Sequence, residues 1–342
     1  MSTQTDNIQV APWKRAMTRV QRTLHAYPAL SPAVILVVIV VAFTIINPRF
    51  ADPQTLSLLV QQSAVIAALA LGQTLIILTS GIDLSVGAVA ILVTLVMAEL
   101  SASAGVPGWL ALVVGIVLGT LAGLFNGALV TRVALPPFIV TLGSLSIFTA
   151  IGLLVSGAQS TRAADMAPIL SWTGATFHVA GFSITSGVVL VLVAYLVVGF
   201  ALSRTAWGTH VYAVGGDQEA ARLSGIRVRA VTLSVYLVAG AIYAFAAWVL
   251  VGRAGAATPN GIVDGNLQSI TAVIIGGTSL FGGKGSMIGT FVGVLLIGVI
   301  NNGLTLLNVS SFWVQFVQGA LIFLAVLLDS VSTRRRSRQS RS

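Results

Sequence analysis

SRTAWGTHVYAVGGDQEAARLSGIRVR, residues 203–229, is a long polar interruption in a chain that otherwise consists largely of aliphatic residues and glycine. Its ionisable side chains are Arg204, His210, Asp217, Glu219, Arg222, Arg227 and Arg229. Connections between neighbouring elements are usually short. A patterned polar loop in the middle of the chain therefore predicts a surface at which a partner docks.

The composition on both sides of this loop indicates an integral membrane protein. Of the 342 residues, 56% are hydrophobic and only 8% are charged, and the mean hydropathy is +0.98. A soluble globular protein carries about 25% charged residues, which cover its apolar core. The chain contains no cysteine, which excludes disulfides, thiol catalysis and cysteine-ligated metals.

The net charge of +9 is concentrated at the edges of the apolar segments. Basic residues precede the first segment and follow the last: Lys14, Arg15, Arg19, Arg22, Arg334, Arg335, Arg336, Arg338 and Arg341. Lys and Arg resist translocation, so we expect both termini in the cytoplasm. Contacts with lipid headgroups would be additional, and we expect no nucleic-acid partner. Pro32–Ile46 lacks a small-residue cleavage site and predicts an uncleaved first span.

Apolar segments of roughly 20 residues can cross the hydrocarbon layer as helices, and the sequence predicts about ten of them. We expect spans near residues 32–46, 56–79, 85–101, 109–130, 137–156, 183–202, 231–251, 267–280, 285–306 and 310–329. The first and the eighth are short, and the eighth could be re-entrant. With the N-terminus inside, nearly every loop Lys and Arg then lies in the cytoplasm. The exceptions stand alone in outer loops: Arg49, Arg162 and Arg253.

An internal repeat supports this arrangement of spans. Two segments share Asn-Gly and a later Val: FNGALVTRV at 125–133 and NNGLTLLNV at 301–309. The matching residues are always 176 positions apart, and Gly143 and Gly319 show the same separation. A shift by this offset aligns the second span with the seventh, the fourth with the ninth and the fifth with the tenth. The two spans of each pair run through the membrane in opposite directions. Two inverted five-helix halves, with the pathway at their interface, recur among transporters.

The motif SGIDLSVGA, residues 80–88, places an acid close to the bilayer. An ionised carboxylate there is costly unless it is paired or hydrated. One interpretation makes Asp83 and Ser85 a gate or a structural node on the pathway. The other makes Asp83 the cap of the third span, because the N-terminus of a helix favours a carboxylate. Both interpretations could hold.

Amide side chains are the other polar groups in the spans. Asn126 belongs to the first copy of the repeat and Asn301 and Asn302 to the second, and further amides lie at Gln61, Gln62, Gln73, Gln268, Gln315 and Gln318. Such groups bond to another helix, to water or to a polar solute. We take Gln73, Asn126, Asn301 and Asn302 as pathway candidates, with bonding between helices as the alternative for each. Phe138, in the motif ALPPFIVTLGSL, is a candidate as well, although packing also explains it.

The glycine-rich stretch GGTSLFGGKGS, residues 276–286, does not form a nucleotide site. A P-loop needs Gly-Lys-Ser or Gly-Lys-Thr at a fixed spacing after a strand. Here Lys284 precedes Gly285, and apolar spans flank the stretch. We expect a hairpin on the cytoplasmic side. Metal-ligand clusters and catalytic triads are not evident, so we expect a transporter rather than an enzyme.

Six motifs together resemble one family: GIDLSVGA, FNGxLV, PPFIVTLG, VGGxxxAARLSGI, IIGGTSLFGGKG and NNGLxLLxVSS. This set, from about Ala51 to Asp329, is similar to the permease subunits of bacterial sugar ABC importers of the ribose, xylose and arabinose type. The resemblance implies an inner-membrane permease, a second protomer in a homodimer or pseudo-dimer, a cytoplasmic ATPase that holds ATP and Mg²⁺, and a periplasmic sugar-binding protein. It implies no cofactor on this chain. It also implies that the chain shares the fold class of permeases of the vitamin B12 importer type.

The resemblance also implies a role for the polar loop as a coupling helix that fits a cleft of the ATPase. It places this role on Gly216, Asp217, Glu219, Ala220, Ala221, Gly225 and Ile226. Asp217 can cap a short helix, and Gly225 can end it in a left-handed conformation. The alternative is an amphipathic helix on the membrane surface. The first span shifted by the offset falls inside this loop, so the loop is an insertion between the two halves.

The expected all-α organisation has five parts. They are a cytoplasmic basic segment at 1–30, the first membrane half with span six at 31–202, the coupling loop at 203–230, the second membrane half at 231–329, and a basic cytoplasmic tail at 330–342. The expected function is ATP-driven import of a monosaccharide, such as a ribose-like pentose or a hexose. The alternatives are an ABC permease for a sugar-like signal or an amino acid, an ion-coupled secondary transporter, and a membrane scaffold or receptor without flux.

Overall fold

The structure, a computed structural model, describes residues 30–262, 264–321, 323–324 and 327. The expected basic tail and nearly all of the N-terminal segment lie outside this part. Six described helices are long and apolar enough to cross a membrane: α3 (Pro53–Leu78), α5 (Gly108–Thr131), α6 (Pro137–Ser156), α8 (Ser186–Arg204), α11 (Val228–Ala254) and α13 (Met287–Leu306). The expected all-α integral membrane architecture is confirmed at this level. The count of ten spans stays a prediction.

The remaining helices are shorter. Three are apolar: α2 (Leu30–Ile46), α4 (Val86–Ala102) and α12 (Gly265–Ile275). The polar loop forms α9 (Ala206–Gly216) and α10 (Gln218–Leu223), and residues 311–321 are helical. Short pieces complete the described chain: η1 (Pro48–Ala51), η2 (Ala163–Asp165), α7 (Pro168–Ser171) and η3 (Trp172–Gly174).

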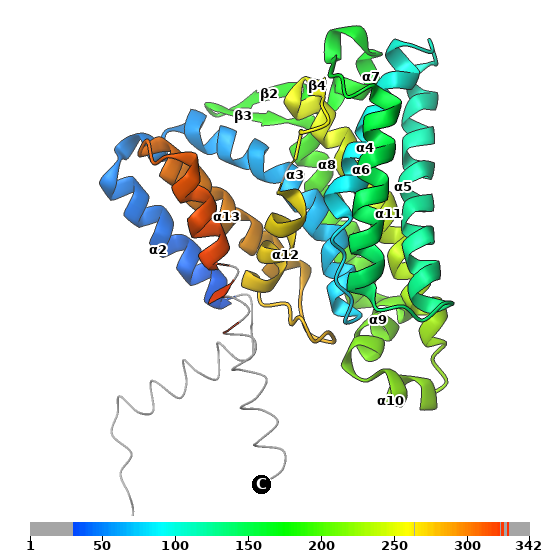
Figure 1. Cartoon of the computed structure of the whole chain (residues 1–342). Helices are drawn as coiled ribbons and strands as arrows, with labels where there is room; N and C mark the ends of the chain where they lie inside the picture. Colours follow the sequence, from blue (N-terminus) through cyan, green and yellow to red (C-terminus); the bar gives the residue numbers. More distant parts are fainter. Residues whose placement is uncertain (1–29, 263, 322, 325–326, 328–342) are drawn as a thin grey trace, which may run out of the picture.

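Two small antiparallel sheets lie at the end of the bundle opposite α9 and α10 (Figure 1). Strand β1 (Thr161–Arg162) pairs with β4 (Ala256–Ala257), and β2 (Thr176–Val179) forms a hairpin with β3 (Phe182–Thr185). The sequence reading did not foresee them. Because β3 occupies 182–185, the sixth apolar helix begins at Ser186 rather than at the expected 183.

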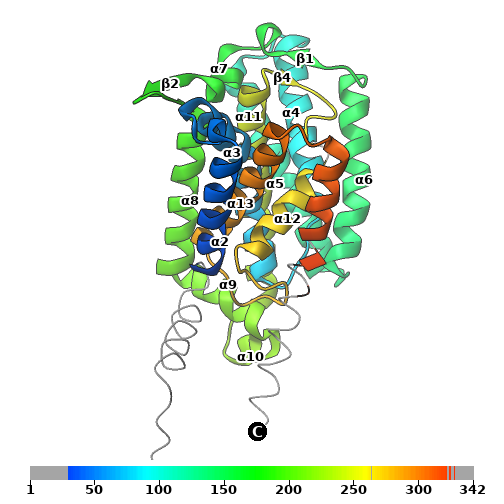
Figure 2. The same cartoon turned by 90° about the vertical axis from the view of Figure 1, so that its left-hand side faces the viewer.

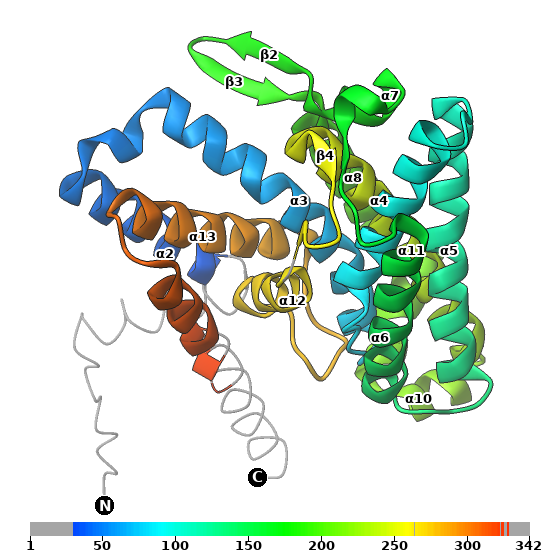
Figure 3. The same ribbon diagram turned by 45° about the horizontal axis from the view of Figure 1, so that its top comes forward.

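Helices α3 and α11 pack against each other at the centre, and each also packs against two helices from the other half of the chain. Helix α11 contacts α4 and α5, whereas α3 contacts α12 and α13. A shift of 176 residues carries Pro53–Leu78 onto 229–254, and α11 is Val228–Ala254. The observed bounds thus agree with the repeat offset. Figure 3 shows α2 and α13 on one side of α12, with α4, α5 and α6 on the other.

The predicted eighth span was wrong in length. We expected 267–280, but α12 ends at Ile275 and has 11 residues. At about 1.5 Å per residue this is about half of the hydrocarbon thickness, so α12 cannot cross the membrane alone. The glycines that follow adopt left-handed backbone conformations, beginning with Gly277 at φ 88°. Figure 2 shows α12 in the middle of the face that lies between α8 and α6.

Glycine allows α5 and α11 to approach closely in the core. A Cβ atom on Gly123 would meet the backbone carbonyl of Tyr236, and one on Gly240 would meet that of Gly119. Small residues at such contacts let membrane helices approach within van der Waals distance. The position of α11 therefore depends on the absence of side chains at these sites.

Gly123→Ala should lower the thermal unfolding temperature of the purified protein, because overpacking of this kind costs about 1–3 kcal/mol. Gly199→Ala on α8 is the matched control, since its Cβ would lie 3.8 Å from the Met287 side chain, an ordinary contact. Thermal unfolding in detergent, followed by tryptophan fluorescence, makes the comparison. Equal unfolding temperatures for the two variants would show that α5 and α11 do not approach as closely as described.

Candidate functional site

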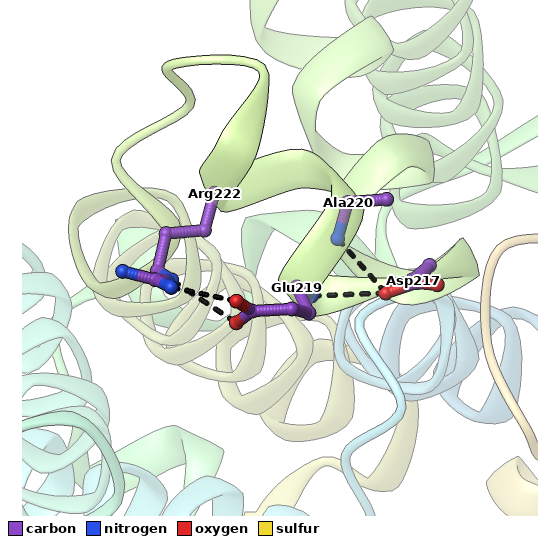
Figure 4. Close-up of polar contacts among 4 residues, drawn as sticks. All are labelled: Asp217, Glu219, Ala220 and Arg222. Atoms are coloured by element: carbon purple, nitrogen blue, oxygen red, sulfur yellow. Dashed lines mark hydrogen bonds and ion pairs between the residues drawn. The ribbon is translucent and has the colours of Figure 1, made fainter.

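The polar loop forms two consecutive helices joined at Asp217. Its extended backbone, at φ −159° and ψ 107°, ends α9 and starts α10. One carboxylate oxygen accepts hydrogen bonds from the backbone N–H groups of Glu219 (2.9 Å) and Ala220 (3.0 Å), as Figure 4 shows. The predicted cap at Asp217 is confirmed.

The far end of α10 also folds as expected. Gly225 has φ +84°, its N–H donates to the carbonyl of Arg222, and the N–H of Ile226 donates to that of Ala221. These bonds close the helix at the predicted left-handed glycine. Gly225 has open space around it, so its backbone angle alone favours glycine.

The outer face of α10 is exposed at the tip of the molecule (Figure 1). Arg222 forms a bidentate ion pair with Glu219 (3.0 Å for Nε and 2.6 Å for Nη2), and this hydrogen bonding raises the pKa of the Arg222 guanidinium. Leu223 is 76% exposed beside them, whereas Ala221 is buried. This face thus presents one projecting apolar side chain beside an ordered ion pair.

The C-terminal end of α9, next to Asp217, is fixed by backbone contacts. A Cβ on Gly215 would collide with the carbonyl of Leu78 at the end of α3 and would lie 2.6 Å from the nitrogen of Gly283. The N–H of Gly283 donates to that same Leu78 carbonyl (3.0 Å). The hydroxyl of Tyr212 donates to the carbonyl of Gly285 (3.0 Å). The coupling loop, the end of α3 and the glycine-rich stretch therefore meet at one junction.

Asp83 does not cap α4, and this expectation was wrong. Its carboxylate accepts hydrogen bonds from the N–H (2.7 Å) and the hydroxyl (2.6 Å) of Ser85, and α4 has no side-chain cap. The donor, Ser85, is itself the residue that precedes α4, so the Asp83 carboxylate bonds ahead of the helix and not to the N–H groups of its first turn. The alternative, a structural node, fits this geometry, and the gate stays a prediction.

The predicted residues Gln73, Ser85 and Asn126 lie with Asp83 in the packed interior. Asn126 donates to the Ser85 hydroxyl (2.9 Å), and the Tyr243 hydroxyl contacts the Gln73 carbonyl oxygen (3.4 Å). All four predicted residues are at most 1% exposed. Their bonds join α5 to the start of α4 and α3 to α11, and none of the four lines the two cavities described next.

Two adjoining cavities lie beside α12. One of about 250 Å³ lies against α13 and the helix at 311–321, and one of about 290 Å³ lies against α3 and α13. Asp264, Gln268 and Asn301 line both. Amides of the wider set line one or the other: Gln62, Gln315 and Gln318. This place combines several two-way hydrogen-bonding groups with apolar walls.

Sequence reasoning found the amides of these cavities but missed the charged pair. Arg253 and Asp264 both line the second cavity. Arg253 had been assigned to an outer loop, although it lies in the last turn of α11. Asp264 had not been singled out, and its place next to Gly265 before a short apolar segment was the available signal. Phe138 is 49% exposed on α6 and, like Asn302, lines neither cavity.

The described residues contain no group of three or more His, Asp and Glu side chains that could hold a metal ion. The interior polar groups bond mainly to helices, and the cavity groups are amides with one acid and one base. This chemistry suits the transient binding of a polar solute.

Comparison with known proteins identifies the family. Residues 55–326 match the family described as branched-chain amino acid transport system / permease component. The chain is 41% identical to the fructose import permease protein FrcC of Rhizobium meliloti, over 92% of this chain and 89% of that protein. It is 38% identical to the ribose import permease protein RbsC of Bacillus subtilis (88% and 92% covered) and 36% identical to the D-allose transport system permease protein AlsC of Escherichia coli (88% and 91%). No solved structure matches.

Asp217→Ala should destabilise α10 by about 1 kcal/mol, the usual cost of losing an N-cap. Amide hydrogen exchange measured by mass spectrometry should then speed up by about fivefold over 218–226, since α10 opens locally. Asp217→Asn keeps a capping oxygen and should exchange like the unaltered chain. Equal protection of α10 in the alanine and asparagine variants would contradict the cap.

Proposed function

The chain belongs to the family of branched-chain amino acid transport system permease components, and we propose that it is the permease subunit of an ATP-driven monosaccharide importer. One observation carries the proposal. The relatives at 41%, 38% and 36% identity cover most of the chain, and each is named as a permease for a monosaccharide: fructose, ribose or allose. The chain itself then carries out no reaction, and ATP and Mg²⁺ bind to a partner ATPase.

The two polar cavities are the proposed transit site. A monosaccharide presents hydroxyl groups that both donate and accept hydrogen bonds, and the side-chain amides of Gln268 and Asn301 do the same. Tight binding in this place would slow release, so weak amide contacts suit transport. High affinity is then supplied by a separate sugar-binding protein on the periplasmic side.

An amino acid is the second candidate solute. Arg253 and Asp264 line the same cavity and could hold the carboxylate and the ammonium of a zwitterion. The name of the matched family points in this direction as well. Ring hydroxyls also bond to these two side chains, so the pair alone does not decide between the solutes.

The exposed face of α10 is the proposed site for the ATPase. Its features are a projecting leucine, an ordered ion pair and a rigid cap at each end. The position of α10 at the tip of the bundle and the backbone contacts of α9 support coupling more than an amphipathic helix lying on the membrane (Figure 1). Both termini would then be cytoplasmic, and the sheets at the opposite end would face the periplasm of the inner membrane.

The finer architecture follows from the same proposal. We expect ten membrane segments in two inverted halves of the vitamin B12 importer type, with α12 entering the membrane without crossing it alone. Helix α3 packs against helices of the second half and α11 against helices of the first half, which supports this symmetry. A second permease protomer would complete the path, and closure of the ATPase would switch both protomers between outward- and inward-open states.

The complex with its ATPase and sugar-binding protein, reconstituted in proteoliposomes, tests the function. Pentoses, hexoses and leucine are loaded in turn onto the binding protein encoded beside the chain. We expect ATP hydrolysis and uptake to rise together with one monosaccharide. A rise with leucine alone would favour the amino-acid alternative and contradict the sugar assignment.

Asn301→Ala should reduce uptake by about fivefold at solute concentrations well below saturation, because one net hydrogen bond to the solute represents about that factor in affinity. Asn302→Ala is the matched control, since Asn302 is the next residue on α13 and lines neither cavity. Radiolabelled uptake and ATP hydrolysis are measured for both variants. If Asn302→Ala impairs uptake and Asn301→Ala does not, the cavities are not the transit site.

Gly225→Ala should uncouple the complex, because alanine in a left-handed conformation costs about 1–2 kcal/mol and distorts the end of α10. We expect ATP hydrolysis that no longer rises with the loaded binding protein, and the same from Glu219→Ala, which removes the ion pair. Gly157→Ala is the control, since Gly157 ends α6 with φ 57° and has similar open space. Normal coupled transport in Gly225→Ala would contradict the docking role of α10.

A further inference from the structure

One short segment connects the junction beneath α9 to the residues that flank the polar cavities. Residues 80–85, here called the strap, leave the end of α3 at Ser80 and enter α4 after Ser85. Its residues alternate in burial. Gly81, Asp83 and Ser85 are buried, whereas Ile82 and Leu84 are half-buried.

At its first residue the strap contacts the coupling loop. Ser80 has φ 63°, and its hydroxyl lies 3.1 Å from the carbonyl of Gly215 and 2.9 Å from that of Phe281. A hydroxyl has one hydrogen, so Ser80 can donate fully to only one carbonyl at a time. The position of Ser80 thus depends on where the end of α9 lies relative to the glycine-rich stretch.

In its middle the strap is held by neighbouring helices. The Thr141 hydroxyl of α6 donates to the carbonyl of Ile82 (3.1 Å) and accepts from the N–H of Leu84 (3.1 Å). Ile82 and Leu84 pack against Ile270 and Ile274 of α12. Asp83, through Ser85, is bonded to Asn126 of α5. The strap is therefore held along its length and has little freedom to move independently of these helices.

At its last residues the strap contacts the start of α12. The amide of Asn266 donates to the carbonyl of Leu84 (3.4 Å), and a Cβ on Gly87 would lie 3.6 Å from the backbone nitrogen of Asn266. Asp264 and Gln268, two residues to either side of Asn266, line both cavities. A shift of the strap would therefore displace cavity-lining residues.

We propose that the strap transmits the position of α10 to the polar cavities, with Ser80 and Asn266 as its positioning residues. The inference rests on the proposed function, because it needs an ATPase docked on α10. The path runs from α10 through Gly215 to Ser80, and from Leu84 through Asn266 to Gln268. Its contacts are the hydrogen bond of Ser80 to Gly215 and that of Asn266 to Leu84, and the chain itself joins the rest. Coupling between separated sites requires an element whose position both sites affect, and the strap is proposed as that element for α10 and the cavities.

The absence of cysteine makes a direct test possible. A Gln268→Cys reporter is the only thiol on the chain and lines both cavities. Its reaction rate with a charged, membrane-impermeant methanethiosulfonate is measured in the reconstituted complex, with the ATPase either free of nucleotide or trapped with ATP and vanadate. The ratio of the two rates reports how strongly the state of the ATPase changes the cavity.

Ser80→Ala, added to the reporter, should bring this ratio about fivefold closer to one, the factor that one net hydrogen bond represents. Alanine has much the same left-handed backbone cost as serine, so the change removes only the hydroxyl. Ser203→Ala is the control, because the Ser203 hydroxyl bonds within its own helix to the carbonyl of Gly199 (2.7 Å). We expect the control to keep the full ratio and both variants to retain the ATPase in pull-down.

Asn266→Ala, at the opposite end of the strap, gives an independent result if Ser80→Ala does not assemble. It should also reduce the ratio while leaving the ATPase bound. An unreduced ratio in both strap variants would overturn the inference and leave the proposed function standing. A reporter whose rate does not respond to the ATPase even with the strap intact would overturn the proposed function and the inference together.

Discussion

The contact between Gly215 and the carbonyl of Leu78 is the constraint on which the functional arrangement depends. Neither partner leaves room for a side chain, and the N–H of Gly283 donates to the same carbonyl at 3.0 Å. Three stretches that are distant in sequence thereby share one backbone junction. Because backbone cannot be repacked as a side chain can, a movement of α9 must be matched by α3 or by the glycine-rich stretch.

The membrane gives this junction its importance. A buried backbone or side-chain polar group costs free energy unless it is bonded, and lipid offers no partners. Some interior groups bond between helices, as the Asn126 amide nitrogen does to the Ser85 hydroxyl, whereas the amides beside α12 line the cavities. The bonded interior groups and the cavity-lining groups thus lie in different places. The strap of residues 80–85 belongs to the bonded interior, and the carbonyl of its Leu84 accepts from Asn266, which lies two residues from the cavity-lining Asp264 and Gln268.

Much of this arrangement was predictable from sequence, for identifiable reasons. Hydropathy placed the apolar helices, and Asp217 and Gly225 predicted both ends of α10, because capping chemistry is local. Asp83 was ambiguous, since a carboxylate before a helix can bond to its first turn or, as here, to Ser85. The length of α12 and the strands at 161–185 and 256–257 were missed, because apolar composition alone does not show where a helix stops. The cavities could not be foreseen, since they join Gln62, Arg253 and Asn301 from three separate helices.

The most direct measurement is solute uptake by proteoliposomes that contain the complete complex and are supplied with either ATP or an ion gradient. If the chain is an ATP-driven permease, we expect solute to accumulate only when ATP is on the ATPase side of the membrane and the loaded binding protein is on the opposite side. Imposed proton or sodium gradients should then drive no uptake. Accumulation with an ion gradient in the absence of ATP would contradict coupling through α10 and would favour a secondary transporter.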